Sequence, residues 1–155
     1  MTLTDQVQRF FEEDEWEYTE TDAAMHITFG GRNGIWECLA VIRENAGQFL
    51  FLSLAPLTVP SERYALVAEY LMRANFGLFI GNFELDFDSG TMQYRTSIDV
   101  EGQEEALSSL VIKHLVYQNV LTMDKYLPGL AAVLDGSSSP AAAVRLIESA
   151  DPDPL

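Results

Sequence analysis

The sequence predicts an α+β domain in which helices pack against an antiparallel sheet. Short alternating apolar runs indicate strands, longer segments with apolar residues at helical spacing indicate helices, and brief turn sequences join the strands. The expected order is α-βββ-α-ββ-α followed by a C-terminal helix. With 155 residues, 48% of them hydrophobic and 21% charged, the chain has the composition of one globular domain. We assign this domain to residues 1–150 and expect residues 151–155 to form a frayed tail.

The first half of the domain is predicted to hold one helix followed by three strands. Thr4 is the expected N-cap of a helix over about residues 4–14, where apolar residues recur at helical spacing. Strands are predicted over residues 24–30, 35–43 and 48–55, between turn sequences. The last two of these are apolar over long stretches, which favours a central sheet region covered on both faces.

The pairing of the first two strands decides whether a reactive dyad can form. One register sets His26 opposite Cys38, the arrangement of a base and a nucleophile, but it also sets Ile27 against Glu37. The other register sets Ile27 beside Cys38 and matches apolar faces. We predict the second register, in which Cys38 is a core residue.

The second half is predicted to begin with a helix that Thr58 or Ser61 caps and that Gly77 ends in a left-handed conformation. A long helix is expected over about residues 104–126, and Pro128 should kink or end it. Two segments follow: a short helical piece over 129–134 and a last helix that begins at Pro140.

A β-hairpin is predicted between these helices, around a two-residue Ser89-Gly90 turn. This turn length fixes which residues face each other across the two strands. The expected pairs are Phe87 with Met92, Leu85 with Tyr94, and the ion pair of Glu84 with Arg95.

The net charge of −15 limits the classes of partner. Nucleic acids and anionic membranes are disfavoured, because both bind mainly through Lys and Arg. Residues 1–22 alone hold eight acids and one base. The acids serve either solubility through self-repulsion or an acidic face for a basic partner.

Motifs for catalysis, metals and cofactors are absent from the sequence. One cysteine excludes an internal disulfide, and with no secretory signal or apolar run of membrane-spanning length it indicates the cytoplasm. His26 and His114 match no zinc pattern, and the acids around Gly90 depart from a calcium loop. We expect His114 to be packed on the apolar side of the long helix, and we predict no catalytic residue, metal or cofactor.

The long helix is apolar over most of its circumference, more than one buried face requires. One stripe is expected to cover the sheet: Leu107, Leu110, Val111, His114, Tyr117 and Leu121. A second arc is a candidate dimer or partner interface: Ile112, Leu115, Val116, Val120 and Met123. The alternative is that the C-terminal segment, residues 130–147, folds back over this second arc.

Residues 70–99 carry a family resemblance. They read Tyr-Leu-Met-Arg-Ala-Asn-Phe-Gly-Leu from Tyr70, Gly-Asn-Phe-Glu-Leu-Asp from Gly81, and Tyr-Arg-Thr-Ser-Ile from Tyr94. This block resembles the YbjN family, as do Met123 to Pro128 and the Ser139-Pro140 helix. The resemblance covers about residues 3–150. It implies a type III secretion chaperone-like fold, whose members are small, acidic, cytoplasmic homodimers that bind extended client segments, and it carries over no active site.

The favoured hypothesis is a non-enzymatic protein-binding module, chaperone-like or regulatory, that forms a homodimer. A client peptide could add to the strand over residues 91–98 if that strand lies at an edge of the sheet. The alternative is a small-molecule sensor or enzyme with a pocket between sheet and helices, where Asp86, Arg95 and Asp99 would supply polar groups. A third hypothesis is a structural subunit of a larger complex.

Overall fold

The computed structural model describes residues 1–150 and confirms the α+β fold class. The predicted tail at 151–155 lies outside the described residues. Six strands form one antiparallel sheet in the order β1-β2-β3-β4-β6-β5. The strands are β1 Thr19–Glu20, β2 Met25–Gly30, β3 Ile35–Arg43, β4 Gln48–Thr58, β5 Asn82–Leu85 and β6 Thr91–Asp99. The helices are α1 Leu3–Glu13, α2 Tyr64–Gly77, α3 Ser109–Leu134 and α4 Pro140–Ala150, with 3-10 turns at Glu44–Ala46, Ser61–Arg63 and Glu104–Ala106.

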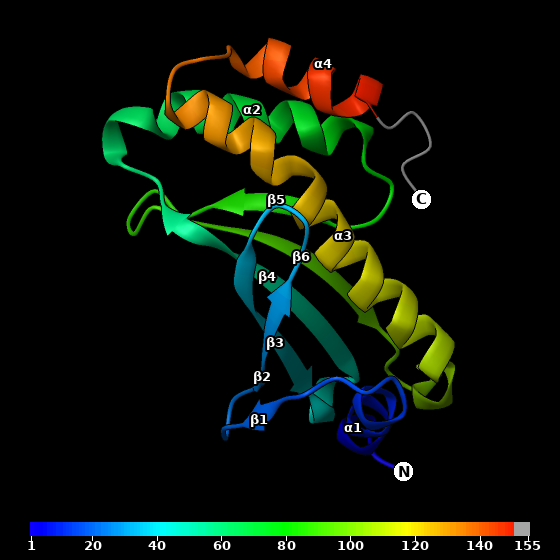
Figure 1. Ribbon diagram of the computed structural model, residues 1–155. Coiled ribbons are helices and arrows are strands. Elements are labelled where there is room, and N and C mark those ends of the chain that lie inside the picture. Colours follow the sequence, from blue (N-terminus) through cyan, green and yellow to red (C-terminus); the bar gives the residue numbers. More distant parts are fainter. Residues whose placement is uncertain (151–155) are drawn as a thin grey trace.

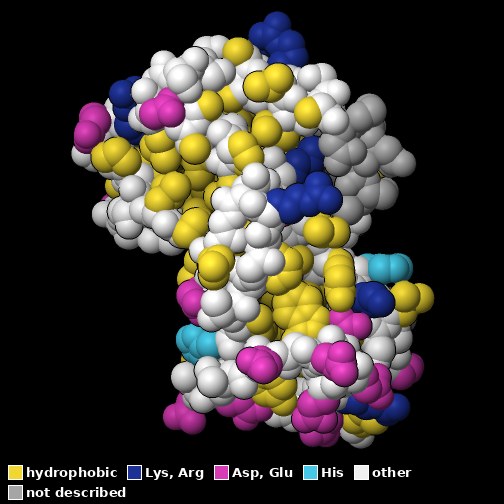
Figure 2. Space-filling view, in the orientation of Figure 1, with side chains coloured by type: hydrophobic (Ala, Val, Ile, Leu, Met, Phe, Trp, Pro, Cys, Tyr) yellow, Lys and Arg dark blue, Asp and Glu magenta, His cyan; other side chains and the backbone are white. Residues whose placement is uncertain are grey.

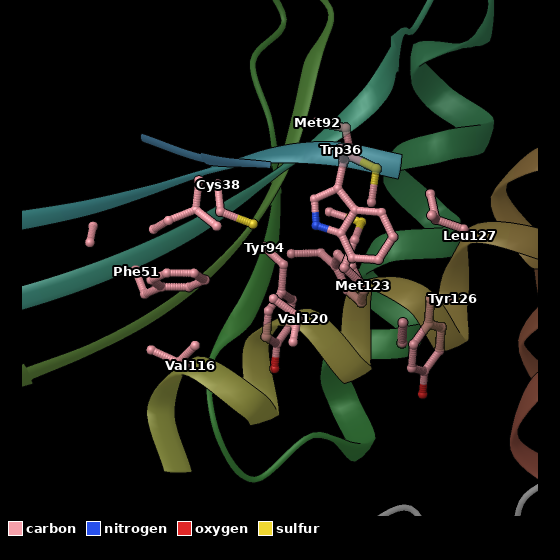
Figure 3. Packing of buried hydrophobic residues seen from close by; sticks show 14 of the residues in the cluster. Trp36, Cys38, Phe51, Met92, Tyr94, Val116, Val120, Met123, Tyr126 and Leu127 are labelled. Atoms are coloured by element: carbon pink, nitrogen blue, oxygen red, sulfur yellow. The ribbon is translucent and has the colours of Figure 1, made fainter. Parts of the chain in front are cut away.

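The core lies between the sheet and α3, which crosses it diagonally (Figure 1). Figure 3 shows Phe51 and Tyr94 of the sheet pointing toward Val116 and Val120 of α3, and all four side chains are fully buried. The opposite sheet face carries Leu39, Val41, Leu50, Leu52 and Leu54, which lie outside this core. The core is therefore built on one face of the sheet, and the expectation of a two-sided core is wrong.

The predicted pairing of the first two main strands is confirmed. Ile27 lies opposite Cys38, and His26 lies opposite Leu39 on the other face of the sheet. The Cys38 side chain is fully buried with its Sγ 3.5 Å from Ser53 Oγ, and burial raises the pKa of its thiol to about 12. The His26–Cys38 dyad therefore does not form.

The predicted hairpin register is wrong by two residues. Leu85 lies opposite Met92, and Phe83 lies opposite Tyr94. The connection is longer than predicted because Asp86 accepts hydrogen bonds from the Asp88 N–H and the Ser89 hydroxyl. A shift of two keeps every side chain on its original face, so the apolar pattern fits both registers. The ion pair of Glu84 and Arg95 forms across the diagonal at 3.0 Å.

The second arc of α3, and not the stripe predicted for it, makes the main contact with the sheet. Ile112, Val116, Val120 and Met123, four of the five predicted interface residues, are fully buried in the core of this chain, and Leu115 is half-buried. In the expected sheet-covering stripe, Leu107 is fully buried and Val111 and Tyr117 are half-buried against the core, but His114, Leu110 (61% exposed) and Leu121 (43% exposed) are exposed. Both arcs of the helix are apolar, so hydropathy alone could not decide which one meets the sheet.

Pro128 lies inside α3 and does not end it. The helix continues to Leu134 and changes direction in its last third (Figure 1). The chain then folds back, and α4 packs against both α2 and α3. The C-terminal segment therefore returns over the long helix, as in the alternative. It covers the C-terminal end of α3, however, and the second arc is covered by the sheet instead.

Three predicted helix ends also differ. Thr2, not Thr4, is the N-cap of α1 and forms a capping box with Asp5, while Thr4 hydrogen-bonds to Glu44. Helix α2 follows a 3-10 turn and has no side-chain cap. Gly77 is its last residue and is not left-handed. In the described part of the chain, none of the helices is both long and apolar enough to cross a membrane.

Candidate functional site

One edge of the sheet is open next to a groove. Strand β1 is only two residues long and pairs with His26 and Met25 of β2. Among the described residues, nothing continues this ladder along residues 27–30. The strand at 91–98 was a candidate only if it lay at an edge, but β6 lies between β4 and β5 and is an interior strand. That condition is not met, and the open edge belongs to β2.

The peptide groups of Thr28 and Gly30 point outward at this edge. The Gly31 N–H donates to the Gly34 carbonyl at 2.8 Å, in the same register that pairs Phe29 with Trp36. Bonded and non-bonded pairs alternate along an antiparallel ladder. Phe29 therefore exchanges hydrogen bonds with β3, whereas Thr28 and Gly30 present their N–H and C=O groups to the side where β1 has ended.

The opposite edge of the sheet, at β5, is capped at Phe83. The Phe83 N–H donates to Asn75 Oδ1 at 2.7 Å, and Asn75 Nδ2 donates to the Phe83 carbonyl at 3.1 Å. One amide at the end of α2 thus satisfies both outward groups of the edge residue. Unpaired strand edges attract other strands, and this cap hinders strand addition at Phe83.

A groove of about 410 Å³ separates the open edge from the chain that precedes β1. Glu15 adopts a left-handed conformation, with φ of 60°, directly after α1. This turn leads the chain alongside β2 without pairing to it. The groove is lined by Asp14, Glu15, Trp16, Glu17, Ile27, Thr28, Phe29 and Gly30.

Aromatic rings form the apolar wall of the groove. Trp16 stacks on Phe29 with ring centroids 5.6 Å apart, and Tyr117 of α3 meets Trp16 edge-on at 5.8 Å. The Phe29 ring also packs against the buried Trp36, with ring centroids 5.1 Å apart. The Trp16 and Phe29 rings that line the groove are half-buried, so they offer apolar surface while their packing keeps them fixed.

Asp14 holds this wall in place. Its carboxylate accepts hydrogen bonds from Tyr117 Oη at 2.6 Å and Trp16 Nε1 at 2.8 Å, and it lies 3.9 Å from Lys113 Nζ. The bonds from Tyr117 and Trp16 keep the pKa of the Asp14 carboxyl below its ordinary value. Asp14 is therefore an anion that orients two aromatic rings.

Asp124 fastens the turn at the end of the open edge to α3. Its carboxylate, on a residue only 9% exposed, accepts the N–H groups of Arg32 at 3.0 Å and Asn33 at 2.8 Å. Pro128 has no N–H to offer the Asp124 carbonyl, and Asn33 Nδ2 donates to that oxygen at 2.9 Å instead. A Cβ on Gly31 would lie 2.5 Å from the Asp124 carboxylate, so the close approach needs glycine.

The residues predicted for a small-molecule site are only partly brought together. Asp86 and Arg95 line an open pocket of about 390 Å³, but Asp99 lies at the other end of β6 and accepts a hydrogen bond from Gln48. The pocket lies on the sheet face away from the core helices, not between sheet and helices as predicted. Arg95 is already paired with Glu84, which also accepts from Gln93.

The groove residues Trp16, Thr28 and Phe29 were not singled out from the sequence. The sequence signal for them is that the alternating apolar strand at 24–30 directly follows the acidic segment at 1–22. Figure 2 shows the result: acidic side chains gather over the lower part of the molecule, around α1 and β1, beside an apolar patch. Within residues 1–150, no group of three or more His, Cys, Asp or Glu side chains is placed to hold a metal ion.

The comparisons with known proteins found a matching family model and similar solved structures. The family model described as "YbjN: Putative bacterial sensory transduction regulator" matches residues 4–132. The chain is similar to the structure titled "Crystal structure of YbjN, a putative transcription regulator from E. coli", with 16% identity, a TM-score of 0.47, and coverage of 74% of this chain and 93% of that one. It is also similar to "Structure of the HopA1-SchA Chaperone-Effector Complex", with 18% identity, a TM-score of 0.49, and coverage of 77% and 88%. Among curated proteins, none matches.

Proposed function

Since the chain belongs to the YbjN family, we propose that it is a non-enzymatic protein-binding module with a chaperone-like or regulatory role. The observation that carries the proposal is the open edge at residues 27–30, which faces an aromatic groove while the other edge of the same sheet is capped at Phe83. A partner segment in an extended conformation would add to this edge as a strand.

The geometry supports short, reversible binding. Thr28 and Gly30 together offer two N–H donors and two C=O acceptors, and each hydrogen bond gained from water contributes about 0.5–1.5 kcal/mol. At a rise of about 3.3 Å per residue, the edge accommodates roughly four residues of a partner strand. An apolar side chain on the Phe29 face of that strand would contact the Trp16–Phe29 pair. Part of the free energy gained from these hydrogen bonds and this apolar contact offsets the entropic cost of ordering the partner segment.

A proline substitution tests the proposal at the backbone. Thr28→Pro removes an outward N–H that no other strand uses, so the sheet should keep its own ladder. Leu85→Pro is the matched control, because Leu85 also presents its N–H outward, but at the β5 edge. Peptides selected from a random phage-displayed library against the full chain should bind the control as they bind the original chain and should lose binding to Thr28→Pro. Equal binding to all three proteins would refute edge addition.

The predicted homodimer and cytoplasmic location belong to the same proposal. A dimer would need a surface other than the buried arc of α3, and Phe76 and Phe79 are the most exposed large apolar side chains of the described residues, at 95% and 101%. Light scattering at micromolar concentration tests this assembly. A dimer mass that falls to that of a monomer in Phe76→Ser plus Phe79→Ser supports it, and a monomer mass for the original chain contradicts it.

A further inference from the structure

We infer that the groove selects a basic segment: an extended strand with Lys or Arg at alternate residues and an apolar side chain between them. This inference rests on the proposed function, because it assigns a chemical class to the strand that residues 27–30 would accept. Three features of the described residues carry it: the carboxylates of the groove, the cations near them, and the alternation of side chains along an added strand.

The carboxylates line the side of the groove that faces the open edge. Asp14, Glu15 and Glu17 all contribute to its lining. Asp14 is engaged with Tyr117 and with Lys113, whereas Glu15 and Glu17 are exposed and their carboxylates make no hydrogen bond or ion pair within residues 1–150. Two carboxylates on residues that line the groove are thus available to a cationic ligand.

The nearby cations leave this charge largely uncompensated. Lys113 lies 3.9 Å from Asp14, and Arg9 is paired with Glu13 at 2.7 Å. Arg32 lies in the turn beyond Gly31, past the end of the edge. The negative potential is therefore strongest toward the β1 end of the groove, and it favours a cationic partner over a neutral or an acidic one.

The alternation of an added strand separates apolar from basic positions. Side chains on the Phe29 face would meet the Trp16–Phe29 pair, and those on the Thr28 face would emerge on the opposite side of the sheet. On that side Glu37 lies opposite Thr28, and its carboxylate accepts a hydrogen bond from the Thr28 hydroxyl at 2.8 Å. A long Lys or Arg side chain beside Thr28 would reach this third carboxylate, whereas a shorter polar side chain would not.

The test uses three fluorescein-labelled nine-residue peptides in which valine alternates with lysine, threonine or glutamate. Binding to the full chain is measured by fluorescence anisotropy at 50 and 500 mM salt. We expect the lysine peptide to bind about tenfold more tightly than the threonine peptide at low salt, and the glutamate peptide to bind most weakly. The preference for lysine should shrink at high salt.

Paired neutral variants locate the charge effect. Glu15→Gln plus Glu17→Gln should weaken the lysine peptide about tenfold and leave the threonine peptide unchanged. Glu104→Gln plus Glu105→Gln removes the same charge from an exposed turn that does not line the groove, and should leave the binding of both peptides unchanged. If both pairs weaken the lysine peptide equally, attraction to the overall charge explains binding, and the inference is overturned.

The outcomes separate this inference from the function on which it rests. If lysine and threonine peptides bind equally and Thr28→Pro abolishes both, the basic class is overturned while edge addition stands. If none of the three peptides binds, both fall. If the lysine peptide binds best, and if Thr28→Pro and the Glu15→Gln plus Glu17→Gln pair weaken it while the control variants do not, edge addition and the basic class are both supported.

Discussion

Replacing Asp124 by alanine should strongly destabilise the domain and loosen the turn at the end of the open edge. The substitution removes a carboxylate that is 9% exposed and accepts two backbone N–H groups, from Arg32 and Asn33. Hydrogen bonds to a charged acceptor contribute about 1.5–3 kcal/mol each. Because the turn can relax and admit water, we expect the lower end of their sum, a loss of about 3 kcal/mol in the free energy of unfolding.

The assay is urea unfolding followed by tryptophan fluorescence, since Trp36 packs beneath this turn. A loss of that size would lower the midpoint by roughly 1–2 M urea, or the melting temperature by roughly 6–12 °C. Asp124→Asn keeps one acceptor and should lose about half as much. Hydrogen exchange of both the Arg32 and the Asn33 amides should accelerate in Asp124→Ala, and that of only one of them in Asp124→Asn, because an amide that loses its acceptor exchanges faster.

Asp135→Ala is the matched control for this experiment. Asp135 directly follows α3 and its carboxylate also accepts a backbone N–H, that of Ser137 at 2.8 Å, but the residue is exposed. Its loss should cost less than about 1 kcal/mol. A stability of Asp124→Ala within 1 kcal/mol of the original chain, with unchanged exchange at Arg32 and Asn33, would refute the role assigned to Asp124.

Three further substitutions test other parts of the account. Asn75→Ala should expose the outward groups of Phe83, cost about 1–3 kcal/mol, and increase self-association measured by light scattering. Gly129→Ala would place a Cβ against the Tyr70 hydroxyl, which donates to a carbonyl of α3, and should lower stability by about 2 kcal/mol in urea unfolding. Asp14→Asn should cost about 1 kcal/mol at pH 7. Because the pKa of Asp14 is lowered in the folded state, its contribution is fully present above about pH 4 and is lost as the pH falls through the folded-state pKa, so the two stability curves should converge in acid.

The fold class and the β2–β3 register could be predicted because they depend on short-range pattern. A wrong register would have set Ile27 against Glu37, and apolar alternation excludes that. The hairpin register failed for the converse reason: a shift of two leaves both faces intact, and only the side-chain hydrogen bonds of Asp86 lengthen the loop. An alternating apolar pattern determines which face of the sheet a side chain occupies, but it does not determine the register along the strand.

The site could not be predicted because it depends on where strands lie in the sheet. The sequence order of β5 and β6 suggests an edge at the second strand of the hairpin, but β6 pairs with β4 and becomes interior. The groove also needs the left-handed backbone of Glu15, for which the sequence offers no glycine or asparagine signal. Likewise, Val116 and Val120 face the sheet rather than a partner because of long-range packing, which local hydropathy does not record.

The two edges of the sheet are protected in different ways, and the difference bears on function. At β5 the Asn75 amide occupies the outward groups of Phe83, so no strand can add there without displacing it. At β2 the backbone is open, but carboxylates surround it. A second copy approaching edge to edge would bring Glu15 and Glu17 near their own counterparts, and like charges would repel. Charge thus discourages self-pairing without closing the edge, and a basic strand is the partner that this form of protection does not exclude.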